Sequence, residues 1–322
     1  MTTPQVPLDS PFGYRSTAAE VVAGATLAST TAVVTGGYSG VGKETVRALA
    51  GAGARVIVGA RRPETATEEL RDVSGQVEIL ALDLATPASI KTFAAACAAT
   101  ARALDLLVNN AAVMACPLAR DARGYESQLA TNHLGHFQLT ARLWPLLTAA
   151  GQARVVVLSS SGHARGGLDL TDPHFVRRPY DKWTAYAQAK SANALFALHL
   201  DTLGHRRGVR AFAVHPGGIR TPLQRHLTMD EQTALGWYDK DGQLNPLFKS
   251  VEQGASTSVW CAVSPLLEGK GGVYCSDCNI ASPWTEGQPP HVGVHPHVRD
   301  AEAAAAWWAA SEQMIGARFN VD

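Results

Sequence analysis

The sequence has little that would direct it to a nucleic acid or a membrane. Its 28 Lys and Arg residues balance 28 Asp and Glu residues, so no basic excess predicts binding to nucleic acid or to an anionic surface. The apolar runs are short, and none approaches the roughly 20 residues of a membrane-spanning helix. The first twenty residues lack a basic start followed by an apolar block, so we predict no signal peptide. A cytoplasmic protein with neither nucleic-acid nor membrane partners is the expectation.

Cysteine is also scarce, with five residues among 322, scattered along the chain in an odd number that does not indicate a disulfide framework. Cys275 and Cys278 have CxxC spacing. A zinc site would need a second pair of ligands, for which His291 and His295 are the nearby candidates. A redox pair would open a helix after a strand, whereas this pair follows the strand-like end of "GGVYCSDC". We favour an incidental pair, with a metal or redox site as the alternative, and predict no metal.

What is present is a long alternation of two patterns in a chain that is 46% hydrophobic. Ala-rich segments with helical spacing separate apolar, β-branched runs, as expected for a parallel sheet covered on both faces. The sequence therefore predicts an α/β fold with a doubly wound, Rossmann-type parallel sheet in one domain. The strand-like runs lie at 31–35, 55–60, 77–82, 104–109, 154–159 and 209–214.

The chain divides into three predicted parts. Residues 1–30 form an N-terminal extension, 31–280 the Rossmann-type domain, and 281–322 a C-terminal loop and helix. One helix start is well marked, because Thr86 can cap it and Pro87 suits its first position. In the last helix, Trp307 and Trp308 are expected to be packing residues rather than ligand contacts.

Glycines cluster in "AVVTGGYSGVGKET", residues 32–45, where the first strand should turn into a helix. The N-terminus of a helix suits a phosphate, and glycine lets the backbone approach it closely. The spacing is Gly36-x-x-x-Gly40-x-Gly42, which differs from the general G-x-G-x-x-G pattern. Taken alone, the loop predicts either a phosphate site or a tight turn.

Further motifs follow in order. They are "LDLLVNNAAV" with Asn110, "TNHLGHF" with Asn132, "VVVLSSSGH", Tyr186-x-x-x-Lys190 and "HPGGIRTP". Over about residues 30–275, the ordered set resembles the short-chain dehydrogenase/reductase family, whose motifs are TGxxxGxG, NNAG, a helical Asn, a Ser, YxxxK and PG. Ala112 stands where that family usually has Gly. The sequence is similar to the retinol-dehydrogenase-like branch, whose bacterial members are often labelled daunorubicin C-13 ketoreductase-like.

The chemistry of carbonyl reduction needs a proton donor. Tyr186 and Lys190 are four residues apart and share one helix face. A neighbouring ammonium would lower the pKa of Tyr186 from about 10 and make it a usable general acid or base. The resemblance implies that Lys190 also bonds the nicotinamide ribose and that Ser160 hydrogen-bonds the substrate oxygen, with Ser159 and Ser161 as alternatives.

The resemblance also implies that Asn132 supports a water-mediated proton path to Lys190; the alternative is a residue at a helix bend. The histidines of this region are expected to be structural or loop residues, namely His133, His136, His163 and His215.

The end of the second strand bears on the cofactor. NAD-binding folds commonly have an acidic residue there, whereas an arginine suits the 2′-phosphate of NADP. Here Ala60 occupies that position and Arg61 and Arg62 follow. We predict NADPH, with Arg61 as the main contact and NAD less favoured; the alternative is that both arginines are solvated charges. The expected cofactor contacts, several of them implied by the resemblance, are Gly36, Tyr38, Ser39, Gly40, Val41, Gly42, Arg61, Asp83 and Leu84 (near the adenine), Asn110, Ala111, Tyr186, Lys190, Pro216, Gly217, Ile219 and Thr221 (at the nicotinamide amide).

Two loop regions should shape a substrate pocket, near 163–183 and 220–250. Ser160 and Tyr186 are 26 positions apart, about twice the spacing of many relatives. The loops carry the aromatic residues that predict a bulky, apolar or aromatic substrate, although these residues could simply anchor the loops. The arginines of the first loop could meet an acidic group or be solvated. The aromatic residues are Phe175, Tyr180, Trp183, Trp237, Tyr238 and Phe248. The arginines are Arg165, Arg177 and Arg178.

The sequence therefore predicts an NADPH-dependent carbonyl reductase and alcohol dehydrogenase acting on a bulky small-molecule substrate. An NAD-dependent alcohol dehydrogenase is one alternative. A non-catalytic dinucleotide-sensing protein is another, disfavoured because Asn132, Ser160, Tyr186 and Lys190 are all present. A homodimer and a monomer are both compatible with the sequence.

Overall fold

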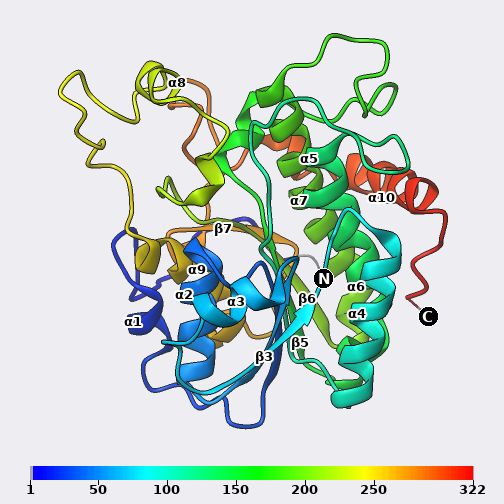
Figure 1. Ribbon diagram of the computed structural model, residues 1–322. Helices are drawn as coiled ribbons and strands as arrows, with labels where there is room; N and C mark the ends of the chain where they lie inside the picture. Colours follow the sequence, from blue (N-terminus) through cyan, green and yellow to red (C-terminus); the bar gives the residue numbers. More distant parts are fainter. Residues whose placement is uncertain (1–2, 322) are drawn as a thin grey trace.

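Eight strands form one sheet in the order β3-β2-β1-β4-β5-β6-β7-β8, as seen in the computed structural model, which describes residues 3–321 (Figure 1). All neighbouring strands are parallel except β7 and β8. The strands are β1 (Thr31–Thr35), β2 (Arg55–Ala60), β3 (Gln76–Ala81), β4 (Leu106–Asn109), β5 (Ala153–Leu158), β6 (Val209–His215), β7 (Val273–Ser276) and β8 (Asn279–Ile280). The predicted doubly wound parallel sheet is confirmed.

The six expected strands all form, with ends within two residues of the predicted ones. Their apolar residues are buried because both faces of the sheet are covered; Val34, for example, pairs with Val58 and Val108, and all three are fully buried. The sequence did not predict β8, which is only two residues long and leaves β7 through a turn at Asp277 and Cys278.

Helices α4, α6 and α7 cover one face, and α1, α2 and α9 the other. A π-helical stretch, Ala130–Leu134, joins α5 to α6. The helices are α1 (Ala18–Val22), α2 (Gly40–Gly51), α3 (Pro63–Glu69), α4 (Pro87–Thr100), α5 (Ser127–Leu129), α6 (Gly135–Ala149), α7 (Lys182–Gly204), α8 (Met229–Ala234), α9 (Val251–Val263) and α10 (Ala301–Ile315).

The predicted cap of α4 needs a correction. Thr86 is the N-cap residue and Pro87 follows it, as expected. Among the described residues, however, the Thr86 side chain does not accept a hydrogen bond from the helix; its hydroxyl instead donates to the Asp83 carboxylate at 3.2 Å. The position was predicted correctly and the capping bond was not.

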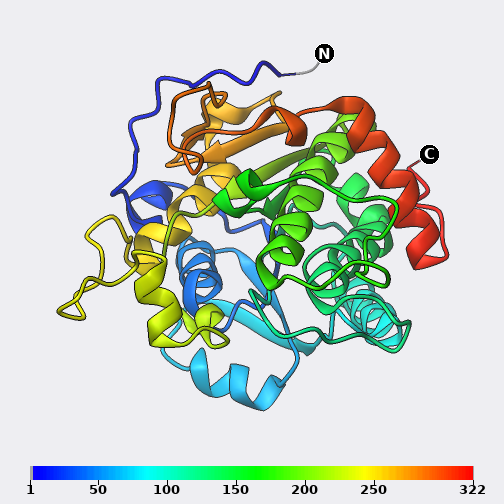
Figure 2. The ribbon, with the colours of Figure 1, turned by 90° about the horizontal axis from the view of Figure 1, so that it is seen from above.

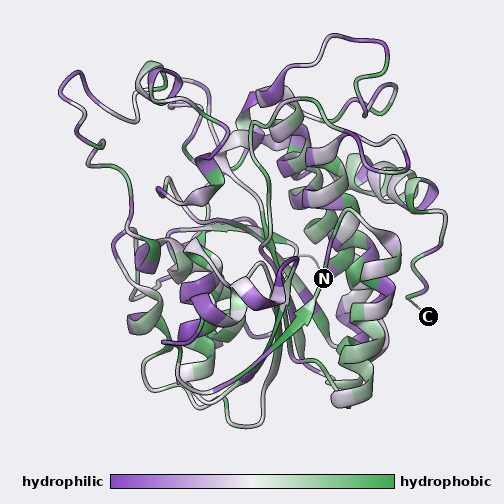
Figure 3. Cartoon of the chain, in the orientation of Figure 1, coloured by the Kyte–Doolittle hydropathy of each residue, from purple (hydrophilic) through white to green (hydrophobic). Residues whose placement is uncertain are grey.

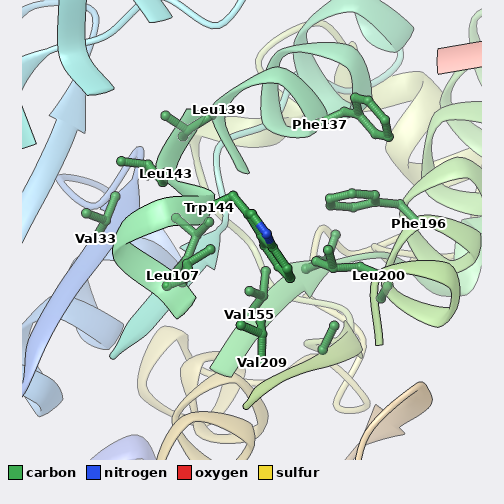
Figure 4. Packing of buried hydrophobic residues seen from close by; sticks show 14 of the residues in the cluster. Val33, Leu107, Phe137, Leu139, Leu143, Trp144, Val155, Phe196, Leu200 and Val209 are labelled. Atoms are coloured by element: carbon green, nitrogen blue, oxygen red, sulfur yellow. The ribbon is translucent and has the colours of Figure 1, made fainter. Parts of the chain in front are cut away.

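The larger core cluster joins the sheet to α4, α6, α7 and α10 (Figure 4). Phe137 of α6 and Phe196 of α7 face each other with ring centres 5.4 Å apart. Trp308 of α10 packs against both rings, and Trp307 is 1% exposed, so their prediction as packing residues is confirmed. Figure 3 shows the corresponding hydropathy, with green strands inside and purple segments outside.

Candidate active site

A cavity of about 1010 Å³ opens at the carboxyl ends of β1, β4, β5 and β6, the edge where open α/β sheets bind ligands. All the expected cofactor contacts line this cavity except Asp83. Of the expected catalytic residues, Ser160, Tyr186 and Lys190 line it and Asn132 does not. Residues predicted from separate motifs are therefore brought together.

The glycine loop between β1 and α2 has the shape of a phosphate cradle. Gly36 and Gly40 have φ angles of 62° and 51°, which favour glycine. A Cβ on Gly42 would lie 2.5 Å from Asn110 Nδ2. Ser39 makes no side-chain capping bond within residues 3–321, so the first N–H groups of α2 can meet an anion. These residues fit the diphosphate of a dinucleotide.

The end of β1 is locked to the end of β4 by Thr35. Its Oγ1 accepts the backbone N–H groups of Asn110 and Ala111 at 2.9 and 3.0 Å, and the Asn110 side chain donates to Thr35 O at 2.8 Å. Thr35 Oγ1 also lies 2.8 Å from His136 Nε2, and His136 Nδ1 lies 2.9 Å from Asn132 O. His136 is thus a structural residue that supports the cofactor edge of the site.

Arg61 lies directly after β2, is exposed and lines the cavity. Its guanidinium makes no hydrogen bond or ion pair that would engage it elsewhere in the described chain. Asp83, by contrast, does not line the cavity: its carboxylate accepts from Ala85 N at 3.0 Å and from Thr86. Its neighbours Leu82 and Leu84 line the cavity instead, so the predicted contribution of the Asp83 side chain is not supported by its position.

The Tyr186–Lys190 pair sits in the first turns of α7, which Asp181 caps by accepting from Thr184 N at 2.7 Å. Both residues are buried, 5% and 2% exposed, and Lys190 Nζ lies 5.7 Å from the Tyr186 ring centre. Lys190 Nζ donates to Leu158 O at 2.9 Å, which ties the helix to the end of β5.

The electrostatics of this pair differ from the prediction. Burial raises the pKa of Tyr186 to about 12, and the Ser160 hydroxyl offsets this only in part. Burial also lowers the pKa of Lys190 to about 7. The prediction that a Lys190 ammonium lowers the pKa of Tyr186 is wrong for the protein alone, because burial penalises the charged form of both groups.

Geometry favours Ser160 among the three serines. The Ser159 hydroxyl is occupied, donating to Lys190 O at 2.8 Å. Ser160 Oγ accepts from Gly162 N at 3.0 Å and is close enough to Tyr186 to affect its pKa. A Cβ on Gly162 would lie 3.1 Å from the Tyr186 ring, so the glycine permits this close approach.

Asn132 lies in the π-helical stretch, fully buried. Its Oδ1 accepts from Val113 N at 2.8 Å and its Nδ2 donates to Val113 O at 2.9 Å. Both ends of the side chain are thus used to hold the chain after β4. This placement fits the helix-bend alternative, and the proton path stays a prediction.

The aromatic residues of the two loops divide into two groups. Trp183, Trp237 and Phe248 line the cavity. Phe175 and Tyr180 instead anchor the first loop: Phe175 is 4% exposed and Tyr180 Oη donates to Cys116 O at 2.9 Å. Tyr238 is also buried outside the cavity lining.

The loop arginines divide in the same way. Arg165 lines the cavity, with its guanidinium 5.3 Å from the Trp183 ring centre. Arg178 lies 3.6 Å from Asp169, and the backbone N–H groups of Arg177 and Arg178 bind the Asp172 carboxylate. Arg177 and Arg178 therefore stabilise the loop, and of the three arginines named in this first loop Arg165 is the one that lines the cavity.

Some cavity residues were missed by sequence reasoning. Met114, His215, Tyr14 of the extension and residues 290–293 of the C-terminal loop all line the cavity. No local motif marks them, because they reach the site only through long-range packing. For His215, its position before Pro216 was the one available signal.

The cysteines and histidines are possible metal ligands. Residues 3–321 contain no group of three or more His, Cys, Asp or Glu side chains placed to hold an ion. Cys275 and Cys278 are free and buried at the β7–β8 turn. His133 accepts from Trp307 Nε1 at 2.9 Å, and His163 Nδ1 lies 2.6 Å from Ser160 O.

The fold and cavity define a dinucleotide-binding α/β protein with a Ser–Tyr–Lys group beside the cofactor cradle. Residues 30–232 match the family described as short chain dehydrogenase. The chain belongs to the short-chain dehydrogenase/reductase family, in its retinol-dehydrogenase-like branch, and is an NAD(P)-dependent oxidoreductase.

The relatives cover nearly the whole chain. A probable oxidoreductase from Streptomyces antibioticus is 47% identical, over 86% of this chain and 94% of that protein. Human retinol dehydrogenase 12 is 37% identical, over 89% of this chain and 87% of its own. The crystal structure of an uncharacterized protein from Mycobacterium paratuberculosis superposes with a TM-score of 0.73 at 33% identity, covering 95% and 99%. In the described part of this chain, no helix is both long and apolar enough to cross a membrane.

Proposed function

We propose that the chain is an NADPH-dependent carbonyl reductase, able to run in reverse as an alcohol dehydrogenase. Its proposed substrates are bulky, aromatic or apolar ketones, aldehydes or secondary alcohols. The observation that carries the proposal is that Arg61 and the group Ser160, Tyr186 and Lys190 line one continuous cavity.

The protein's own groups supply the proton chemistry. Bound NADPH would supply a hydride to the carbonyl carbon. The Tyr186 hydroxyl, whose raised pKa of about 12 keeps it protonated at neutral pH, gives its proton to the carbonyl oxygen. The Ser160 hydroxyl beside it donates a hydrogen bond to the same oxygen as negative charge develops there. Reduction leaves a Tyr186 phenolate that must regain a proton before the next turnover, and oxidation starts from the same phenolate, so its burial sets no preferred direction.

NADPH is favoured over NADH by Arg61. No carboxylate follows β2 to bind a ribose 2′-hydroxyl or repel a 2′-phosphate, because Ala60 ends the strand. A guanidinium without a protein partner at this point suits a phosphate. An NAD-dependent alcohol dehydrogenase is the rival, and it requires that Arg61 stays in solvent.

The bulky substrate is supported by the aromatic lining. Trp183, in the first turn of α7, and Trp237, in the loop after α8, meet edge to face with ring centres 6.3 Å apart. A wall of flat apolar rings near Tyr186 suits an aromatic or polycyclic ketone. A non-catalytic sensor would not need this wall together with an intact Ser–Tyr–Lys group.

The test is NADPH consumption by the purified protein with 2-acetylnaphthalene, alongside NADH and the Tyr186→Phe variant. Consumption that the variant abolishes supports a reductase. Faster consumption of NADH would overturn the cofactor assignment. Dinucleotide binding without any turnover across a panel of ketones and aldehydes would favour the sensor.

The oligomeric state and cytoplasmic location stay predictions. Helix α10 lies over the outer side of α7 (Figure 1), where Trp308 stacks on Phe196 at 5.8 Å. Because α10 covers this side of α7, the arrangement supports a monomer over a dimer that pairs through α7.

A further inference from the structure

The N-terminal extension reaches the substrate cavity. We infer that residues 3–17 form a fixed arm that holds the outer wall of this cavity and so sets the selectivity for bulky over small carbonyl substrates. The inference concerns the wall rather than the chemistry, and rests on the proposed function only for the reaction used to test it.

The first half of the arm is fixed to the sheet. Gln5 is 6% exposed, and its side-chain amide donates to Tyr274 O at 2.7 Å and to Ala281 O at 2.8 Å. Its Oε1 accepts from Tyr274 N at 3.0 Å, so one side chain replaces a strand neighbour at β7. Leu8 and Asn279 exchange two further bonds, of 2.7 and 2.9 Å. Figure 2 shows the blue arm running past the orange strands toward the yellow segment.

The second half of the arm hydrogen-bonds to the second substrate loop, at residues 246–248. Arg15 donates to Pro246 O at 2.6 Å and to Phe248 O at 3.1 Å, and the Tyr14 hydroxyl donates to Leu247 O. Three consecutive carbonyls of the loop are therefore held by two side chains of the arm. Gln253 of α9 donates back to Arg15 O at 3.1 Å, which fixes the arm itself.

Lys249, which follows the gripped carbonyls, fixes the loop from its buried side. Its side chain has no exposure, and its ammonium lies 2.6 Å from the Asp277 carboxylate and 4.5 Å from the Tyr14 ring centre. A cation so fully removed from water needs both partners. Lys249 N also donates to Gly218 O at 2.8 Å. The arm, the β7–β8 turn and the loop after β6 thus meet at this one residue.

A row of rings connects the gripped segment to the reacting group. Phe248 packs on Trp237 with ring centres 5.7 Å apart, Trp237 on Trp183 at 6.3 Å, and Trp183 on Tyr186 at 6.4 Å. All four line the cavity, and so does Tyr14. A loop released at 246–248 would let the outer rings move, while the Ser160–Tyr186–Lys190 group keeps its own supports. Tyr14 and Arg15 are therefore positioning residues for a substrate large enough to reach the outer rings.

The experiment compares Arg15→Ala and Tyr14→Ala with Arg15→Lys, Tyr14→Phe and the control Asp9→Ala, in the full chain. Asp9 is exposed on the same arm, and its side chain makes no hydrogen bond or ion pair with residues 3–321. The probes are 2-acetylnaphthalene and butanal, reduced with NADPH. We expect Arg15→Ala to raise KM for 2-acetylnaphthalene about 5-fold, the loss expected from its exposed hydrogen bonds. In the same variant, kcat for both substrates and the KM values for butanal and NADPH should each change less than about 2-fold. Arg15→Lys should recover part of the loss.

A second measurement reads the arm without turnover. Hydrogen–deuterium exchange of residues 236–249 should become faster in Arg15→Ala and Tyr14→Ala and stay unchanged in Asp9→Ala. Faster exchange with an unchanged ratio of the two KM values would overturn the inference, as would an equal loss for both substrates. If the wild type reduces neither probe, the proposed function fails, and the inference about the arm is then tested by substrate binding without turnover. A weaker Kd of the NADP-loaded Arg15→Ala protein for 2-acetylnaphthalene, by tryptophan fluorescence, supports the arm, and an unchanged Kd overturns it.

Discussion

The two ends of the cavity are built in different ways. At the dinucleotide end, the lining residues lie within a few positions of a strand end, as Gly36 does after β1, Arg61 after β2 and Asn110 after β4. At the substrate end, Tyr14, Trp183 and Trp237 come from segments far apart in the chain. The first end is a property of sheet topology, whereas the second depends on loops and termini packing against one another. Substitutions at the first end should therefore change cofactor use, and those at the second should change substrate choice.

The largest effect should come from closing the phosphate cradle. In Gly42→Ala the new Cβ would meet Asn110 Nδ2 at 2.5 Å and Gly36 O at 2.6 Å, and the backbone atom cannot move away cheaply. We expect NADPH affinity to fall roughly 100-fold, the upper end of the cost of overpacking. Isothermal titration with NADPH measures it.

The control is Gly51→Ala at the end of the same helix, where no atom lies within 4 Å of the new Cβ. This variant should bind NADPH as the wild type does. Equal affinity in the two variants would show that the loop does not enclose the phosphates.

Arg61→Ala should have the next largest effect, selective for one dinucleotide. Losing a charge-assisted bond to the 2′-phosphate should raise KM for NADPH about 10-fold and leave KM for NADH unchanged. Steady-state kinetics with both cofactors distinguish the two. Arg62→Ala is the matched control, because Arg62 is also exposed but does not line the cavity. Equal losses with both cofactors would contradict the 2′-phosphate assignment.

The same contrast explains what could be predicted from sequence. The glycine loop, Asn110 and Ser160 belong to local motifs at strand ends that hydrophobic periodicity locates, and Tyr186 and Lys190 belong to a motif with helical spacing on α7. All five therefore reach the cavity as expected.

Two classes of feature escaped prediction for physical reasons. Asp83 has suitable chemistry, but local hydrogen bonds occupy its carboxylate and it does not line the cavity, and for Phe175, which the sequence left open between pocket and loop anchor, burial supports the anchor. Tyr14 and Val292 enter it only because the two ends of the chain fold back over the sheet. The pKa of Tyr186 was predicted in the wrong direction because spacing shows its neighbour and not its burial.

Trp237→Ala should affect the substrate end alone. Removing one ring of the wall should raise KM for 2-acetylnaphthalene roughly 5-fold through lost aromatic contact, with NADPH binding unchanged. Trp284→Ala is the control, because Trp284 stacks on His295 at 4.7 Å outside the cavity lining. A matching rise in the control would show that the effect is structural rather than local to the wall.

The last effect concerns stability rather than ligand binding, at Lys190 between the two ends of the cavity. Its folded pKa of about 7 lies below its ordinary value of 10.5, so the unfolded chain binds more protons between these values. The free energy of unfolding must therefore rise with pH in this window, as the cost of burying a charged Lys190 is relieved. Tyr186 works in the opposite sense only above pH 10, between its ordinary pKa of 10.0 and its folded value of about 12.

Urea unfolding of the cofactor-free wild type and of Lys190→Met, each at about pH 7 and about pH 9, isolates this term by difference. In the wild type Lys190 should contribute a gain on going to the higher pH, and Lys190→Met, which keeps the length of the side chain without its charge, should lack that gain. Buried histidines such as His133 and His136, and buried cysteines such as Cys97, also contribute to the pH dependence, but they do so in both proteins and cancel in the comparison. Equal slopes for variant and wild type would mean that the Lys190 ammonium stays charged when buried, held by Leu158 O and Tyr186. In that case the positive charge of Lys190 would stabilise the Tyr186 phenolate from which alcohol oxidation starts.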